Sequence, residues 1–74
     1  MTATISNTIR SVRQKKGITQ EELGEAVGVT RQTIIALEKG NYIPSLLLAL
    51  SLSAYFKKSV DELFFMKKMK GTEV

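Results

Sequence analysis

The segment from Thr19 to Gly40 constrains this chain most, because it carries the start and stop signals of two consecutive short helices. Thr19 and Glu22 have the spacing of a capping box, which predicts a helix that begins at Gln20. Gly28 is suited to the left-handed position that ends such a helix. A helix of about two turns therefore opens the segment.

A second helix follows after a three-residue turn. Thr30 is placed to cap it, and Gly40 is placed to end it. The spacing of the apolar residues predicts that both helices pack over one small core, formed by Leu23, Ala26, Val27, Val29, Ile34 and Leu37. The first turn of the second helix is polar instead, which leaves its side chains available to a ligand.

The segment resembles the helix-turn-helix of the lambda-repressor-like family of bacterial and phage transcription regulators, which includes the Cro and Xre proteins. The likeness runs from KKGITQEELG through GVTRQTIIALEKG to NYIPSL, and it covers roughly residues 7 to 65. Gly24 stands where this family usually carries alanine, at a cost of about 1 kcal/mol in helix propensity. The resemblance implies an all-α fold, a compact five-helix DNA-binding domain.

The remaining helices are predicted from apolar spacing and caps. Ile5, Ile9 and Val12 recur at helical spacing and indicate a first helix, after a frayed start over residues 1–4. Ser45 is placed to cap a fourth helix, whose expected core face consists of Leu46, Ala49, Leu52, Ser53 and Phe56. A capping box at Ser59 opens a fifth helix that reaches Phe65. We therefore expect one domain over residues 1–66 and a basic, flexible tail over residues 67–74.

The first turn of the helix after Thr30 is the expected base-reading surface. An arginine can bond O6 and N7 of guanine, and a glutamine can bond N6 and N7 of adenine, so Arg31 and Gln32 suit the major groove. Both match positions that read bases in the resembled family. Thr33 and Ala36 continue the same face, and the short side chain of Ala36 predicts a smaller footprint. The alternative is that this turn is simply solvated.

Phosphate contacts are expected from the residues on either side of the reading helix, because a helix N-terminus attracts anions. The candidates are Thr19, Gln20, Thr30, Lys39, Asn41 and Tyr42. Capping alone would also explain Thr19, and Tyr42 could instead pack against the fourth helix. The resemblance further implies an internal ion pair between Arg13 and Glu38, with a phosphate contact as the alternative role of Arg13.

A second apolar stripe on the fourth helix suggests a partner surface. We expect a homodimer whose contact consists of Leu47, Leu50, Ala54 and the helix-five aromatics Phe64 and Phe65. Dimers of this class place two recognition helices ~34 Å apart on a palindromic site. The alternative is that these leucines are ordinary core residues of a small protein.

Composition limits the other functions. The net charge of +4 favours an acidic partner such as double-stranded DNA. The chain has no cysteine or histidine, no phosphate-binding glycine loop and no carboxylate cluster, so we expect no enzyme, no metal site and no cofactor. We also expect no signal peptide, no membrane span and no small-molecule ligand, and a cytoplasmic location in a bacterial or phage system, at the nucleoid when bound.

The expected function is a sequence-specific regulator, with repression as the outcome on family analogy. The competing interpretation is a protein-binding module, such as an antitoxin-like neutraliser or a polymerase-contacting adaptor. Such a module would use the apolar face of helices four and five as its main surface.

Overall fold

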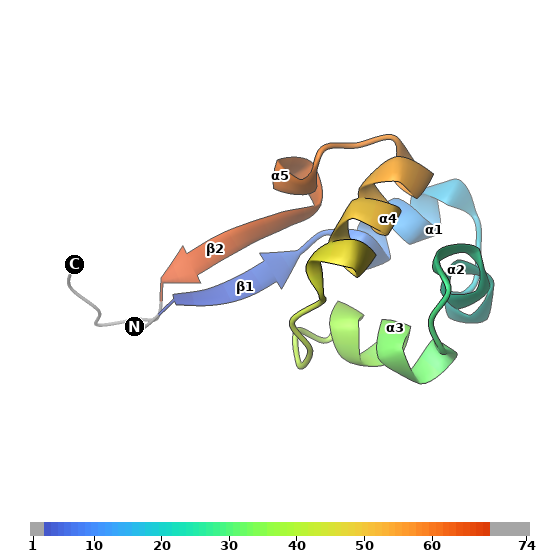
Figure 1. Ribbon diagram of the computed structural model, residues 1–74, viewed down its shortest axis with the longest axis horizontal. Coiled ribbons are helices and arrows are strands. Elements are labelled where there is room, and N and C mark those ends of the chain that lie inside the picture. Colours follow the sequence, from blue (N-terminus) through green and yellow to red (C-terminus); the bar gives the residue numbers. More distant parts are fainter. Residues whose placement is uncertain (1–2, 69–74) are drawn as a thin grey trace.

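The computed structural model describes residues 3–68, which form five helices and two strands. In chain order these are β1 (Ala3–Asn7), α1 (Ile9–Lys16), α2 (Gln20–Val27), α3 (Arg31–Glu38), α4 (Leu46–Phe56), α5 (Val60–Leu63) and β2 (Phe64–Lys68). The helices surround one core, and the strands form a ribbon that projects from them (Figure 1). The expected compact five-helix fold is confirmed, although the two strands make it mainly α rather than all-α. None of the helices in residues 3–68 is long and apolar enough to cross a membrane.

Every helix contributes to the core. Its buried members are Ile9 from α1, Leu23 from α2, Ile34 and Leu37 from α3, Leu48 and Leu52 from α4, and Leu63 from α5. Burial of one such side chain contributes about 1.5–3 kcal/mol. The stability of a domain of this size therefore depends on a small number of buried aliphatic residues.

The N-terminal caps of α2 to α5 lie where the sequence predicts them, but α1 begins at Ile9 rather than near Ile5, and α5 ends at Leu63 rather than Phe65. Thr19 and Ser59 both form complete capping boxes, with Glu22 and Glu62 as their respective partners. Gly17 ends α1 in the left-handed conformation, with φ of 77°. These ends depend on residues within a few positions of one another, which is why the sequence alone locates them.

The paired strands were not predicted. The structure places Ile5 in β1, opposite Met66 in β2, so Ile5 does not belong to α1 and residues 3 and 4 are not frayed. α5 ends at Leu63, and the aromatic residues expected at its end lie in β2. The expected boundary after residue 66 falls inside β2, and residues 69–74 of the expected tail lie outside the described residues. Each strand has five residues, too short for a clear alternation in sequence.

Two residues attach the ribbon to the helices. The Asn7 side chain donates from Nδ2 to the carbonyl of Leu37 at 2.9 Å and accepts the N–H of Ile9 at 3.0 Å. The backbone N–H of Thr8 donates to the carbonyl of Leu63 at 2.9 Å. These bonds connect β1 to the ends of α3 and α5. An isolated two-stranded ribbon is marginal in water, so this anchoring matters for its stability.

The core face of α4 differs from the expected one. Leu46 is 73% exposed, whereas Leu48 is buried together with Ala49 and Leu52. The helix has apolar residues on nearly every side, so periodicity cannot choose its inner face, and its contacts with α2 and α5 decide it. Ala26 of α2 is likewise exposed rather than inward.

Candidate nucleic-acid interface

α2 and α3 form the helix-turn-helix through a turn that begins at Gly28. Gly28 has φ of 80°, a left-handed conformation that favours glycine. The next residue, Val29, donates its N–H to the carbonyl of Gly24 at 2.8 Å. A Cβ atom on Gly24 would lie 2.7 Å from the carbonyl oxygen of Val29. The missing side chain at position 24 therefore lets the turn pack directly against α2.

The first turn of α3 presents two polar side chains to the surroundings. Arg31 and Gln32 are exposed, and within residues 3–68 neither side chain makes a hydrogen bond or an ion pair. Thr33 is half-buried, and its hydroxyl lies 3.1 Å from that of Thr30. Ala36 is half-buried one turn further along. The guanidinium and carboxamide are thus the groups most available for hydrogen bonds to bases.

Arg13 and Glu38 form a bidentate ion pair that joins α1 to α3. Nε of Arg13 donates to Oε2 of Glu38 at 2.6 Å, and Nη2 donates to Oε1 at 3.1 Å. The two side chains are only 11% and 4% exposed. The hydrogen bonds to the Glu38 carboxylate raise the pKa of Arg13 above its ordinary value. Nη1 of Arg13 also donates to the carbonyl of Ile18 at 2.9 Å, so all three guanidinium nitrogens are used.

Gln20 belongs to the same network. Its Nε2 donates to Oε1 of Glu38 at 3.1 Å, and the side chain is half-buried at the first position of α2. The carboxylate of Glu38 therefore accepts hydrogen bonds from α1 and from α2 at once. The sequence indicated Gln20 as a phosphate contact, and the structure adds a role that ties the start of α2 to α3.

The remaining phosphate candidates lie at the two ends of the helix-turn-helix and in the turn between its helices. Thr19 is exposed, and its hydroxyl accepts the N–H of Glu22 at 3.0 Å. Lys39, Asn41 and Tyr42 are exposed after α3, with Tyr42 at 41%. Thr30 caps α3 through the N–H of Thr33. Both threonine hydroxyls thus already serve as helix caps.

Sequence analysis missed Arg10 as a candidate. Arg10 lies on α1, one helical turn before Arg13, and it lines a hollow of about 410 Å³ together with Gln20, Ile35, Glu38 and Lys39. The positively charged groups of Arg10 and Lys39 are both exposed there, whereas that of Arg13 is bound to Glu38. The signal in the sequence was the three-residue spacing of the two arginines, which puts them on one side of α1.

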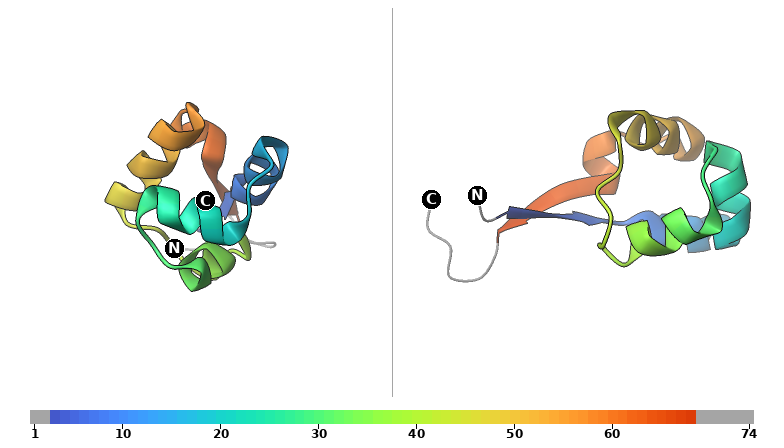
Figure 2. Two further views of the ribbon diagram at one scale, coloured as in Figure 1. Left: turned by 90° about the vertical axis from the view of Figure 1, so that its right-hand side faces the viewer. Right: turned by 60° about the horizontal axis from the view of Figure 1, so that its bottom comes forward.

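The expected dimer residues are divided between two elements. Leu47 is 76% exposed on α4, and Leu50 and Ala54 are exposed as well. Phe64 and Phe65 lie on β2 rather than on helix five, and Phe64 packs against the core while Phe65 is exposed. In Figure 1 and in the right-hand view of Figure 2, the ribbon leaves the helices on the side where the chain enters α4. The ribbon and the start of α4 therefore lie at the same end of the molecule.

Among residues 3–68, no group of three or more acidic residues could hold a metal ion.

Comparison with known proteins gives the family. The helix-turn-helix family matches residues 9–63. An uncharacterised helix-turn-helix transcriptional regulator of Bacillus subtilis, YgzD, is 45% identical over 64 residues, which cover 86% of this chain and 97% of that protein. The transcriptional repressor RstR of the cryptic phage CTXphi in Vibrio cholerae is 33% identical over 78% of this chain and 52% of its own.

A solved structure supports the same assignment. The restriction-modification controller protein C.AhdI of Aeromonas hydrophila superposes with a TM-score of 0.67 at 30% identity, over 73% of this chain and 78% of its own. Residues 9–63, which the family match covers, include both helices of the helix-turn-helix and the core described above. The chain therefore belongs to the helix-turn-helix family of DNA-binding transcriptional regulators of the Cro and Xre type.

Proposed function

We propose that this protein binds a specific palindromic site in double-stranded DNA as a homodimer and represses transcription there. The observation that carries the proposal is the first turn of α3, where Arg31 and Gln32 are exposed and unpaired within the described part of the chain. Each bidentate contact of such a side chain with a base discriminates by about 1–3 kcal/mol. Thr33 and Ala36 extend this reading surface along α3.

Phosphate contacts position the helix in the groove. Lys39, Asn41 and Tyr42 after α3, and Thr19, Gln20 and Thr30 around α2, are the proposed contacts, with Arg10 added on α1. The ion pair between Arg13 and Glu38 acts from beneath this surface, because it fixes α1 and α3 relative to each other. Arg13 is thus an architectural residue rather than a phosphate contact.

Selection of bound sequences from a random DNA pool tests the base-reading assignment. Arg31→Ala should relax one base position in each half-site, whereas Lys39→Ala should lower affinity evenly and leave the selected motif unchanged. The wild-type protein provides the reference motif. Identical motifs from wild type and Arg31→Ala would refute the role of Arg31.

The dimer is proposed to form through the exposed apolar residues of α4 and β2. Leu47, Leu50 and Ala54 lie exposed on α4, and Phe65 lies exposed on β2. Phe64, the preceding residue of the strand, packs against the core. One domain contacts too few base pairs to select a site, and a two-fold pair places two reading helices ~34 Å apart.

Sedimentation at micromolar concentrations without DNA tests the dimer. Leu47→Lys should shift the protein toward monomer, because it puts a charge into the proposed contact. Ala26→Lys adds the same charge at an exposed position on α2 and should leave the association unchanged. A wild-type protein that stays monomeric even with operator DNA present would remove the dimer from the proposal.

Repression is proposed because a small protein that covers a promoter excludes polymerase without needing another domain. The relative RstR is a phage repressor, which supports the same direction. Transcription in vitro from a promoter that contains the selected site should fall as protein is added. An increase in transcript would instead indicate an activator.

A protein-binding module remains the second candidate, and the exposed leucines of α4 are the observation that favours it. The dependence of binding affinity on salt concentration distinguishes the two functions. DNA binding that neutralises Z phosphates should weaken with a slope near −0.9Z in a plot of log affinity against log salt. Binding to a protein through leucines should change far less over the same range.

A further inference from the structure

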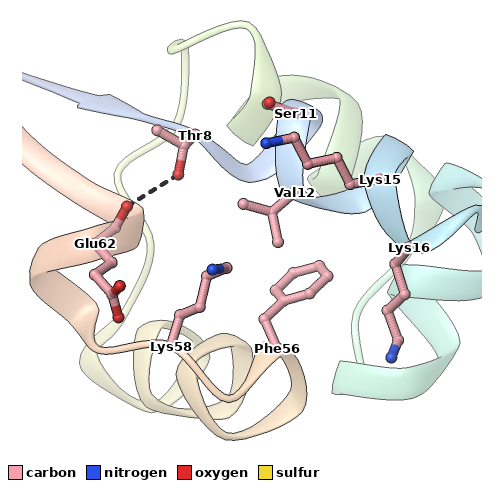
Figure 3. A pocket seen from close by; sticks show the side chains of 8 residues that line it. All are labelled: Thr8, Ser11, Val12, Lys15, Lys16, Phe56, Lys58 and Glu62. Carbon is pink, nitrogen blue, oxygen red and sulfur yellow. Dashed lines mark hydrogen bonds between the residues drawn. The ribbon is translucent and has the colours of Figure 1, made fainter.

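A second candidate site lies away from the reading helix. A cleft of about 640 Å³ opens between α1 and the segment that joins α4 to α5. Its lining residues are Thr8, Ser11, Val12, Lys15, Lys16, Phe56, Lys58 and Glu62 (Figure 3). None of these lining residues belongs to α3. A ligand in this cleft would leave the DNA-reading turn uncovered.

The floor of the cleft is apolar. Val12 of α1 and Phe56 of α4 are half-buried and pack against the core. Figure 3 shows both side chains directed toward the space between the two helices. Their remaining exposed surface lies at the bottom of a concave site, where an apolar group gains most from leaving water.

The rim of the cleft is positively charged. Lys15, Lys16 and Lys58 line it, and within residues 3–68 none of them forms an ion pair. Lys58 extends into the middle of the cleft, while Lys15 extends back along α1 (Figure 3). The ammonium group of Lys16 lies 5.0 Å from the ring centre of Tyr55, at the edge of the site.

The lining also contains one carboxylate, that of Glu62, which offsets part of this positive charge. Oε1 of Glu62 accepts the N–H of Ser59 at 2.8 Å as part of the capping box of α5. This hydrogen bond holds the pKa of Glu62 below its ordinary value, with a smaller contribution from Lys58. The cleft thus combines three ammonium groups and one carboxylate above an apolar floor.

We propose that this cleft binds a small organic anion that carries an apolar group. The acidic group would lie between Lys58 and Lys15, within reach of the Ser11 hydroxyl, and the apolar group would cover Val12 and Phe56. The volume of the cleft lies within the range of about 300–1,000 Å³ that is usual for small-molecule sites. Such a ligand would bridge α1 to α4 and α5.

Phenylacetate is a suitable probe, because it combines one carboxylate with one aromatic ring. Titration into the uniformly ¹⁵N-labelled full chain at low salt should shift the backbone amide signals of Ser11, Val12 and Lys58 in a saturable way. A dissociation constant on the order of millimolar is expected for a probe with about ten non-hydrogen atoms. Phenylacetamide lacks the charge and acetate lacks the ring, so both should bind several-fold more weakly.

Two variants, one inside the cleft and one outside it, test whether phenylacetate binds in the cleft. Lys58→Gln removes the ammonium in the middle of the cleft and should weaken phenylacetate binding about threefold, the size of a partly exposed charge contact. Lys67→Gln removes the same charge on β2, outside the cleft, and should leave binding unchanged. Equal effects of both variants, equal binding of phenylacetamide, or shifts confined to α3 would overturn the proposal, as would the absence of saturable shifts.

Discussion

The ion pair between Arg13 and Glu38 gives the sharpest test of what holds the helix-turn-helix in place. The perturbation is Glu38→Gln, which keeps the shape of the side chain and removes its charge. The two carboxylate oxygens of Glu38 accept three hydrogen bonds, two from Arg13 and one from Gln20. A glutamine offers one oxygen and one amide group, so at least one of these donors would lose its acceptor.

The expected loss is large for a single substitution. Both side chains of the pair are nearly buried, so little solvent screens the charge of Arg13 once its partner is gone. Breaking such a pair costs about 3–5 kcal/mol. The whole domain is stabilised by about 4–11 kcal/mol at 0.05–0.15 kcal/mol per residue, so the variant should be close to the limit of folding.

Thermal and urea unfolding, followed by circular dichroism, measure the effect. The midpoint temperature of Glu38→Gln should fall by at least about 12 °C, because 1 kcal/mol corresponds to about 4–8 °C in a domain of this size. Glu25→Gln makes the same change at an exposed position on α2 and should stay within about 0.5 kcal/mol of wild type.

A double variant distinguishes the charge from the packing. Arg13→Met with Glu38→Leu replaces the pair by apolar side chains, and it should recover most of the stability that Glu38→Gln loses. A cost below about 1 kcal/mol for Glu38→Gln would show that the pair behaves like a surface ion pair, which would refute the reasoning from burial.

Four further outcomes are expected. The pKa of Glu62 is lower in the folded protein than its unfolded value of 4.5, so the ionised carboxylate stabilises the fold above that pH. This stabilisation is lost as the pH falls through the folded pKa. Glu62→Gln should therefore flatten the acidic part of a plot of unfolding free energy against pH. Ser59→Ala keeps the backbone donor to Glu62 and should keep most of the pH dependence. Leu52→Ala should lower the free energy of unfolding by about 2–5 kcal/mol in urea titrations, because the side chain is fully buried. Arg10→Ala should reduce the salt slope of DNA binding by about 0.9 without changing the selected motif, and a changed motif would place Arg10 at a base.

The positions of the helices were predictable because their signals are local. A cap such as Thr19 needs a partner three residues away, and a left-handed glycine such as Gly28 acts on the turn next to it. The polar first turn of α3 was also readable, since a capped helix with a known inner face leaves only a few outward positions. Sequence alone therefore placed Arg31 and Gln32 on the surface.

Contacts between distant segments required the tertiary structure. β1 and β2 pair across some 60 positions of chain, for example Thr4 with Lys67, and neither strand has a strong pattern of its own. The inner face of α4 depended on how that helix meets α2 and α5, since it is apolar on nearly every side. The charged cleft over Phe56 arises from two segments that are at least 40 residues apart in the sequence.

The sequence by itself determined the caps that start α2 to α5 and which turn faces outward, because backbone hydrogen bonding at a capped helix end is decided within a few residues. The tertiary structure decided which apolar residues are buried and which charges meet. Burial and ion pairing depend on distances in space, and a chain of 74 residues brings far-apart positions together in ways that local patterns do not record.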